Sequence, residues 1–229
     1  MKRRPTGPGS FLQRLWESFS SDELRRSMHH TVDRALVKAG WLPEMMDGSY
    51  KILHLSDTPV TIYGYLARLL RRVSPSVLVH TGDLADDIKI GLYPGERERY
   101  RSAVRKLFDI IQAPRRRIIL SLGNHDRMDL LPPIPRECTI CEDVMDFDLW
   151  GAGFRISHYI ERIMDGPAAR FNLYGHTTEP GSHVDDKERY FLNGIERIRL
   201  IDPHTGEIKS LLYPRCTDNA RCMRTMRRL

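Results

Sequence analysis

The side chains best suited to chemistry lie in residues 118–126, IILSLGNHD. The first five are apolar or small, which is typical of a buried strand. Gly123 allows the backbone to turn sharply, and the three residues after it offer an amide, an imidazole and a carboxylate. Reactive side chains of open α/β sheets gather at strand ends of this kind. A polar turn that caps a helix is the alternative interpretation of these residues.

Two earlier strands are predicted to end in the same way. Residues 51–55 form a strand before Asp57, and residues 76–80 form a strand before Gly82-Asp83-x-x-Asp86. A helix is predicted to open at Ser56-Asp57-Thr58, with Pro59 in its first turn, and another covers residues 100–111. Such successive units favour a parallel sheet. We therefore expect one sheet edge to gather the polar side chains of Asp57, Asp83, Asp86, Asn124 and His125.

Two more histidines follow predicted strands in the second half of the chain. Residues 154–157 lead into His158, and residues 171–174 lead into Gly175-His176. Residues 127–150 are expected to be less regular. Further strands are predicted at residues 189–193, 195–201 and 207–212, the last two joined by a hairpin turn.

Carboxylates, one amide and imidazoles from successive strand ends form a hard-to-borderline ligand set, suited to manganese, iron or zinc. A carboxylate placed between two such ions bridges them. Two ions about 3.5 to 4 Å apart clamp a phosphoryl group and lower the pKa of a bound water. The sequence therefore predicts a metal site that makes a hydroxide nucleophile near neutral pH.

The ordered motifs resemble those of the calcineurin-like metallophosphoesterases over about residues 50–212. The motifs are Asp57, Gly82-Asp83-x-x-Asp86, Gly123-Asn124-His125-Asp126, His158 and Gly175-His176. The compact size and the LYGHT segment resemble the small prokaryotic phosphodiesterase branch. The resemblance implies an α/β fold, a two-sheet (αββα) sandwich, here with an N-terminal helical extension. It implies a metal-dependent phosphoesterase, expected to act on diesters more than monoesters, that uses a metal-bound hydroxide in one in-line displacement.

By resemblance, the metal ligands form two sets that share one carboxylate. Asp57 and the bridging Asp83 hold one ion, and the other is held by Asp83, Asn124, His158 and His176. For His158 the alternative is a strand-end histidine without a ligand role. Manganese is the expected metal, with iron, zinc or magnesium as alternatives.

The resemblance also assigns the catalytic pair. His125 is expected to stabilise the transition state and protonate the leaving oxygen, and Asp86 to orient His125.

Two positions depart from the family pattern. The first motif is Asp-x-His in the family but Asp57-Thr58-Pro59 here, and the last is Gly-His-x-His there but Gly175-His176-Thr177-Thr178 here. In the family both missing histidines serve the same ion. We expect one tight metal site and a second that is weak, absent or largely water-ligated. Candidate substitute ligands are His183, Asp185 and Asp186, with His54 and His80 as weaker candidates.

These losses keep a second class of function open, a non-catalytic or weakly active interaction module on a phosphoesterase fold. Retention of His125 and Asp86 argues against that module, because a scaffold has no need of them. A nuclease is a third possibility, suggested only by positive charge.

Composition places limits on the rest. The chain has 229 residues and a net charge of +6, with basic clusters spread along it. An anionic partner is compatible with this charge, nucleic acid included, although no nucleic-acid-binding motif is present. No apolar run approaches the roughly 18 residues of a membrane helix, and the N-terminus lacks a signal-peptide core, so a cytoplasmic location is expected.

The chain is expected to comprise two parts. Residues 1–49 predict a disordered leader and a helical hairpin, and residues 50–229 the phosphoesterase domain. The four cysteines, Cys138, Cys141, Cys216 and Cys222, are compatible with a small zinc site or with ordinary reduced thiols.

Overall fold

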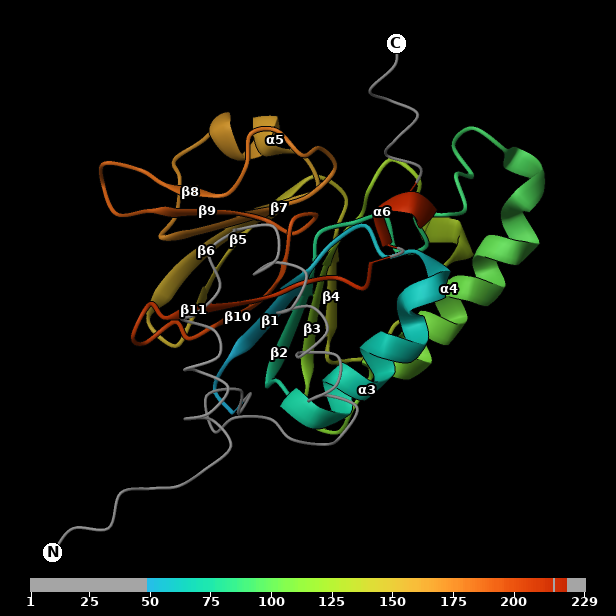
Figure 1. Ribbon diagram of the computed structural model, residues 1–229, viewed down its shortest axis with the longest axis horizontal. Coiled ribbons are helices and arrows are strands. Elements are labelled where there is room, and N and C mark those ends of the chain that lie inside the picture. Colours follow the sequence, from blue (N-terminus) through green and yellow to red (C-terminus); the bar gives the residue numbers. More distant parts are fainter. Residues whose placement is uncertain (1–48, 216, 222–229) are drawn as a thin grey trace, which may run out of the picture. The chain divides into compact units, whose positions relative to one another are not determined.

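The computed structural model describes residues 49–215 and 217–221. The leader and helical hairpin predicted within residues 1–49 lie outside the described residues, as do Cys216 and Cys222. The described strands form a six-stranded and a five-stranded sheet (Figure 1).

The six-stranded sheet has the order β11-β10-β1-β2-β3-β4. Its strands are β1 (Ile52–Leu55), β2 (Val77–His80), β3 (Arg117–Ser121), β4 (Cys138–Cys141), β10 (Ile198–Ile201) and β11 (Ile208–Leu211). β1 to β4 are parallel, and β10 pairs antiparallel with β1. Leu55 is opposite His80, and His80 is opposite Leu120, so the loops after these three strands emerge at one edge. The predicted parallel arrangement is confirmed.

The five-stranded sheet has the order β5-β6-β7-β9-β8. Its strands are β5 (Val144–Leu149), β6 (Ala152–Ser157), β7 (Phe171–Tyr174), β8 (His183–Val184) and β9 (Tyr190–Asn193). β6, β7 and β9 are parallel to one another, which places the residues after β6 and β7 at one edge of this sheet.

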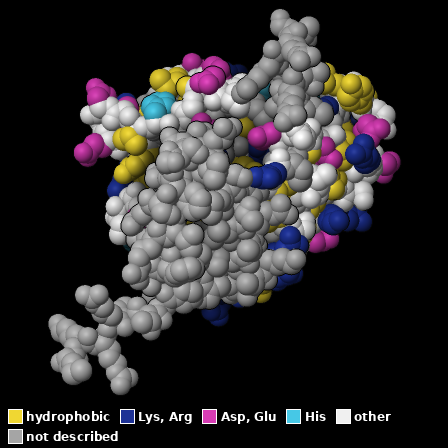
Figure 2. All heavy atoms as spheres, viewed as in Figure 1, with side chains coloured by type: hydrophobic (Ala, Val, Ile, Leu, Met, Phe, Trp, Pro, Cys, Tyr) yellow, Lys and Arg dark blue, Asp and Glu magenta, His cyan; other side chains and the backbone are white. Residues whose placement is uncertain are grey.

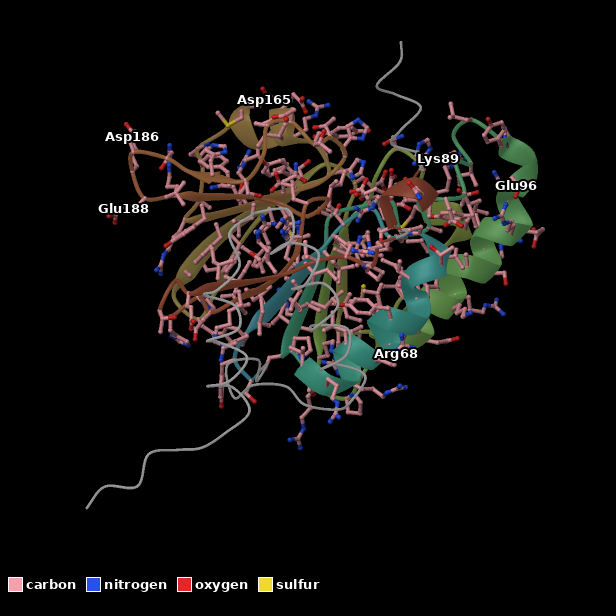
Figure 3. The ribbon with its side chains drawn as sticks, viewed as in Figure 1. Arg68, Lys89, Glu96, Asp165, Asp186 and Glu188 are labelled. Atoms are coloured by element: carbon pink, nitrogen blue, oxygen red, sulfur yellow. The ribbon has the colours of Figure 1, made fainter. Side chains whose placement is uncertain are left out.

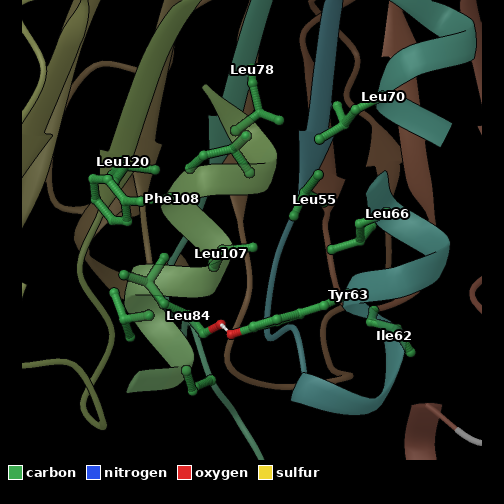
Figure 4. Close-up of a cluster of buried hydrophobic side chains, with 14 of the residues drawn as sticks. Leu55, Ile62, Tyr63, Leu66, Leu70, Leu78, Leu84, Leu107, Phe108 and Leu120 are labelled. Carbon is green, nitrogen blue, oxygen red and sulfur yellow. Dashed lines mark hydrogen bonds between the residues drawn. The ribbon is translucent and has the colours of Figure 1, made fainter. Parts of the chain in front are cut away.

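Helices cover the outer faces of the two sheets. α3 (Tyr63–Val73) and α4 (Arg97–Ile111) pack their apolar faces on the six-stranded sheet, as the buried cluster in Figure 4 shows. A second cluster joins side chains of the two sheets, such as Val79 and Ile119 with Phe154 and Leu173. α5 (Ile160–Met164) packs on Tyr174 and Phe191 of the other sheet. The predicted two-sheet sandwich is therefore confirmed. No described helix is both long and apolar enough to cross a membrane.

Two predicted segments differ from the structure. The first helix does not open at residues 56–58, because Asp57 has a left-handed backbone (φ 51°) and Pro59 is extended. Instead a 3₁₀ turn, η2 (Val60–Ile62), precedes α3. Residues 127–150 are more regular than predicted and contain η4 (Met128–Leu130), β4 and β5. From Met145 on, β5 alternates apolar and acidic residues, MDFDL, a period-two signal that the prediction missed.

The remaining short elements are η3 (Pro94–Glu96), which precedes α4, and α6 (Thr217–Ala220). Arg221, directly after α6, is buried and donates hydrogen bonds to the carbonyl oxygens of Ser56 (3.0 Å) and Asp57 (2.6 Å). The end of the described chain therefore supports the loop that contains Asp57.

Candidate active site

The loops that follow β1 and β2 are hydrogen-bonded to each other. The amide of Asp57 donates to the carbonyl of Gly82 (2.9 Å), and the amide of Thr58 donates to the carbonyl of Asp83 (3.0 Å). Asp57, Asp83 and His176 all have left-handed backbones, with φ of 51°, 54° and 69°. Such conformations are strained for residues other than glycine and are concentrated at functional sites, so these loops are held by their surroundings.

His158, after β6, is oriented by a single backbone contact. Its Nδ1–H donates to the carbonyl oxygen of Thr81 at 2.7 Å, and its side chain is 1% exposed. In the neutral imidazole this contact leaves the lone pair on Nε2, the form that binds a metal. The contact with Thr81 thus holds His158 so that its Nε2 is available as a ligand atom beside Asp83.

Ligand atoms of three other residues lie close to this nitrogen. His158 Nε2 lies 3.1 Å from Oδ1 of Asn124, 3.2 Å from Nδ1 of His176 and 3.8 Å from Oδ2 of Asp83. The ligand atoms of Asp57, Asp83 and His158 lie within 4.8 Å of one another, and all three residues are buried.

These spacings fit a metal centre. Ligand bonds of about 2.1 Å place neighbouring ligand atoms about 3 to 3.5 Å apart. His158 Nε2 and Asn124 Oδ1 are both acceptors in the neutral tautomer, so a cation between them would satisfy both. The predicted ligands Asp57, Asp83, Asn124, His158 and His176 are all present at one site. Asn124 and His176 are exposed, whereas the other three are buried, so the site opens toward solvent on the side of Asn124 and His176.

The electrostatics of the buried carboxylates favour a cation. Burial raises the pKa of Asp83, and the charges of Asp57, Asp126 and Asp86 raise it further. Burial and Asp57 raise the pKa of Asp86 to about 7. A bound cation would stabilise the charged carboxylates that these neighbours disfavour.

Asp126, the last residue of the central motif, has a positioning role that the sequence analysis did not assign. Its carboxylate accepts hydrogen bonds from the amides of Asp83 (2.8 Å), Leu84 (2.9 Å) and Gly123 (2.8 Å). The hydroxyl of Tyr100 in α4 donates a fourth, at 2.7 Å. Asp126 therefore joins the loops after β2 and β3 and anchors both to a helix.

The predicted catalytic pair is arranged differently from the expectation. The carboxylate of Asp86 contacts the ammonium of Lys89, and Nδ1 of His125 is buried without a hydrogen-bond partner among the described residues. The amide of His125 donates to Oδ1 of Asp83 at 3.0 Å. Burial, followed by the charge of Lys89, lowers the pKa of His125 to about 4, so its imidazole is neutral at pH 7.

The positions of the two missing histidines offer no strong ligand. Pro59 is buried at the start of η2, and Thr178 is half-buried. Of the substitute candidates, His183 stacks on Phe191 with a ring distance of 4.8 Å, and Asp185 pairs with Arg189 at 2.6 Å. Both side chains therefore make their contacts within the hairpin of β8 and β9.

His54 and His80 have structural contacts instead of ligand roles. Nε2 of His54 lies 3.0 Å from Oγ1 of Thr81, and Nε2 of His80 lies 3.0 Å from Oγ1 of Thr58. Both histidines are fully buried. Their contacts with Thr81 and Thr58 help to hold the loops that follow β1 and β2.

Cys138 and Cys141 lie at the two ends of β4 and face different clusters. Cys138 packs against the core under α3 and α4, and Cys141 packs against the core between the sheets. Because they point to opposite faces, they do not share one zinc ion. Burial raises the pKa of both thiols, that of Cys138 to about 11, which favours the protonated thiol over the thiolate.

Two further site residues were absent from the sequence prediction. Oγ–H of Ser56 donates to Oδ2 of Asp57 at 2.5 Å. The ring of Tyr159 lies edge-on to His158 (4.9 Å) and His176 (4.7 Å). In the sequence, the signal that could have identified Ser56 and Tyr159 is that each lies next to a predicted ligand, Asp57 or His158.

Comparisons with known proteins identify the family of the chain. A sequence model of the calcineurin-like phosphoesterases matches residues 50–214. No curated protein matches the chain.

Solved structures are similar at low identity. Yfce, a phosphoesterase from E. coli, is 17% identical with a TM-score of 0.48, covering 71% of this chain and 98% of its own. The Thermotoga maritima protein TM1076 is 17% identical with a TM-score of 0.40, with the same coverage. A third structure, 10% identical with a TM-score of 0.51, covers 72% of this chain and 99% of its own. This third likeness concerns the fold alone.

Proposed function

Because the chain belongs to the calcineurin-like phosphoesterase family, we propose that it is a metal-dependent enzyme that hydrolyses phosphate esters, diesters in preference to monoesters. The observation that supports the proposal most is the convergence of Asn124, His176 and Asp83 on Nε2 of His158. Manganese is the metal that we propose for this ligand set. A divalent ion bound there supplies positive charge and lowers the pKa of a coordinated water.

The chain's own residues have separate roles in this proposal. Asp57, Asp83, Asn124, His158 and His176 hold the metal. Thr81 and Ser56 orient His158 and Asp57 through the contacts described above.

His125 is the proposed transition-state and leaving-group residue. Its imidazole is buried and neutral, and its pKa is lowered by burial and by Lys89. An anionic phosphate beside the ring raises that pKa again. Substrate binding therefore favours the protonated imidazole of His125, which donates its proton to the leaving oxygen.

The first test is hydrolysis of an aryl phosphodiester by the full chain with Mn²⁺ and with EDTA. We expect turnover with Mn²⁺ and none with EDTA. Asn124→Ala and His125→Ala should each lower turnover by about 100-fold or more, since each removes a group from the reaction centre. Turnover that survives both substitutions would sink the proposal.

The second candidate, an interaction module with a weakened metal site, is favoured by one observation. Both positions that resemblance reserves for histidine hold weak or non-ligating residues, Pro59 and Thr178. Introducing Pro59→His together with Thr178→His distinguishes the two functions. A large gain in turnover supports an enzyme with a weakened site, whereas no gain and no basal turnover support the module.

The partner is proposed to be a phosphate ester. On the described surface visible in Figure 2, basic and acidic side chains are intermixed. Nucleic acid is therefore left as a substrate to be tested by the salt dependence of binding.

A further inference from the structure

Lys89 is a basic residue that contacts the acidic part of the site. It lies three residues after Asp86, and its ammonium pairs with Oδ1 of that carboxylate. The pair is largely buried: the side chain of Asp86 is 4% exposed and that of Lys89 is 18% exposed. Figure 3 shows Lys89 beside the loop that leads from β2 toward α4.

Backbone contacts hold this lysine in place. The amide of Ile88 donates to the carbonyl of Ala85 at 2.8 Å, and the amides of Leu92 and Tyr93 both donate to the carbonyl of Lys89 at 2.8 Å. The next residues also approach the site closely, because a Cβ on Gly91 would lie 3.1 Å from Nδ1 of His125. The loop therefore presents Lys89 and covers His125 as one piece.

The charge of Lys89 acts on residues from three different strand ends. It opposes the rise in the pKa of Asp83 that burial and the neighbouring carboxylates cause. It adds to burial in lowering the pKa of His125. It also contributes to the lowered pKa of His176, after partial burial and the charge of His158. Its place in the fold agrees with this, because Lys89 pairs with the buried Asp86 and lies two residues before Gly91, which faces His125.

Lys89 adds positive charge to a site that contains several buried carboxylates. Asp126 is already matched by three amides and the Tyr100 hydroxyl. Asp86 is paired with Lys89, and the buried guanidinium of Arg221 adds a second positive charge near Asp57 and Asp86. A second divalent ion would lack two histidine ligands, because Pro59 and Thr178 occupy their positions.

We propose that Lys89 replaces the second metal ion: its ammonium, held by Asp86, binds a phosphoryl oxygen of the substrate. An ammonium has three N–H donors, and with one directed to Asp86 the others are available to a phosphate oxygen. In this arrangement Asp86 is a positioning residue for Lys89. The inference rests on the proposed function, because it assigns a further residue to the same phosphate site.

The test is binding of inorganic phosphate to the Mn²⁺-loaded full chain, measured by calorimetry, in the wild type and in Lys89→Met. Methionine keeps most of the side-chain volume and removes the charge. Loss of a charge-assisted hydrogen bond should weaken phosphate binding by about 10- to 100-fold. Lys187→Met is the matched control. Lys187 is exposed in the β8–β9 loop, whose neighbours Asp186 and Glu188 lie far from Lys89 in Figure 3, and phosphate binding should not change.

Two further measurements keep the inference open to refutation. Lys89→Met leaves the Asp86 carboxylate unpaired, so the double variant Lys89→Met with Asp86→Asn checks that weaker binding is not a folding defect. It should melt near the wild-type temperature and still bind phosphate weakly. Equal phosphate binding by the wild type and Lys89→Met overturns the inference, and so do two tightly bound Mn²⁺ ions per wild-type chain. If the wild type binds phosphate but hydrolyses no ester, the proposed function fails while the comparison with Lys89→Met still decides the role of Lys89.

Discussion

Nε2 of His158 lies 3.1 Å from Oδ1 of Asn124, although His158 follows a strand of the five-stranded sheet and Asn124 follows a strand of the six-stranded sheet. Each side chain depends on its own sheet for its position. A metal held by both would therefore join the two sheets at this edge, so metal binding and stability should be linked.

Metal removal provides the first prediction. At a free Mn²⁺ concentration about 100 times its Kd, the ion should raise the free energy of unfolding by about 2.7 kcal/mol. EDTA should abolish this gain in stability. Protein that is dialysed without EDTA should retain one metal ion per chain. Thermal unfolding with and without EDTA measures the effect. His158→Ala should lose the response, whereas His183→Ala, at an exposed residue, should keep it. Identical unfolding of the wild type in Mn²⁺ and in EDTA would contradict the prediction.

Asp126 gives a prediction about stability. Asp126→Ala leaves the amides of Asp83, Leu84 and Gly123 without their acceptor, and the cost should be about 3 kcal/mol or more. Tyr100→Phe removes a single hydrogen bond to the same carboxylate and should cost about 1.5 to 3 kcal/mol.

Urea denaturation measures both variants, with Asp129→Ala as the control. Asp129 is about half exposed and pairs with arginines at the surface, so its loss should lower the free energy of unfolding far less than the loss of Asp126. An Asp126→Ala protein as stable as the Asp129→Ala protein would show that the loops after β2 and β3 do not depend on this carboxylate.

The sequence was sufficient for the parts of the site that follow strands. Parallel strands bring their carboxyl ends together, so Asp57, Asp83 and Asn124 could be placed at one edge from local patterns alone. His158 and His176 follow strands of the other sheet, and their approach to Asn124 depends on how two sheets pack. That packing was available only through the family resemblance.

Side-chain contacts at the site could not be predicted in the same way. The pairing of Asp86 with Lys89 depends on the turns of residues 85–93, which have no motif in the sequence. The start of α3 was predicted too early because a Ser-Asp-Thr-Pro sequence is typical of a helix N-terminus. Here the amides of Asp57 and Thr58 bond to the neighbouring loop instead, and this tertiary contact overrides the local preference.

Acid sensitivity should follow from the buried histidines beneath the site. Burial lowers the pKa of His80 to about 3, and burial also holds the pKa of His54 well below its usual value. In the unfolded chain both titrate near 6.5, so between these values the unfolded state binds more protons. The stability that each neutral histidine contributes is present above about pH 6.5 and is lost as the pH falls toward the folded value.

For His80 the loss should be about 1.4 kcal/mol per pH unit, or about 2 kcal/mol at pH 5. His80→Gln keeps an amide for the contact with Thr58 but does not titrate. Its free energy of unfolding, measured from pH 7.5 to pH 5, should fall less steeply than that of the wild type. The reason is that unfolding of the variant takes up about one proton fewer. Equal slopes would show that His80 is protonated in the folded state.

Gly175 allows a steric test of the position of Asp57. A Cβ at Gly175 would overlap Oγ of Ser56 and lie 2.5 Å from Oδ2 of Asp57, so Gly175→Ala should push the Asp57 carboxylate out of the site. We expect at least a tenfold loss of Mn²⁺ affinity, and a loss of about 1 to 3 kcal/mol of stability from overpacking. Gly95→Ala is the matched control, because a Cβ there meets no atom within 4 Å. Gly175→Ala with Mn²⁺ affinity equal to that of Gly95→Ala would mean that Asp57 does not bind the metal, since its carboxylate cannot keep its position beside an added methyl group.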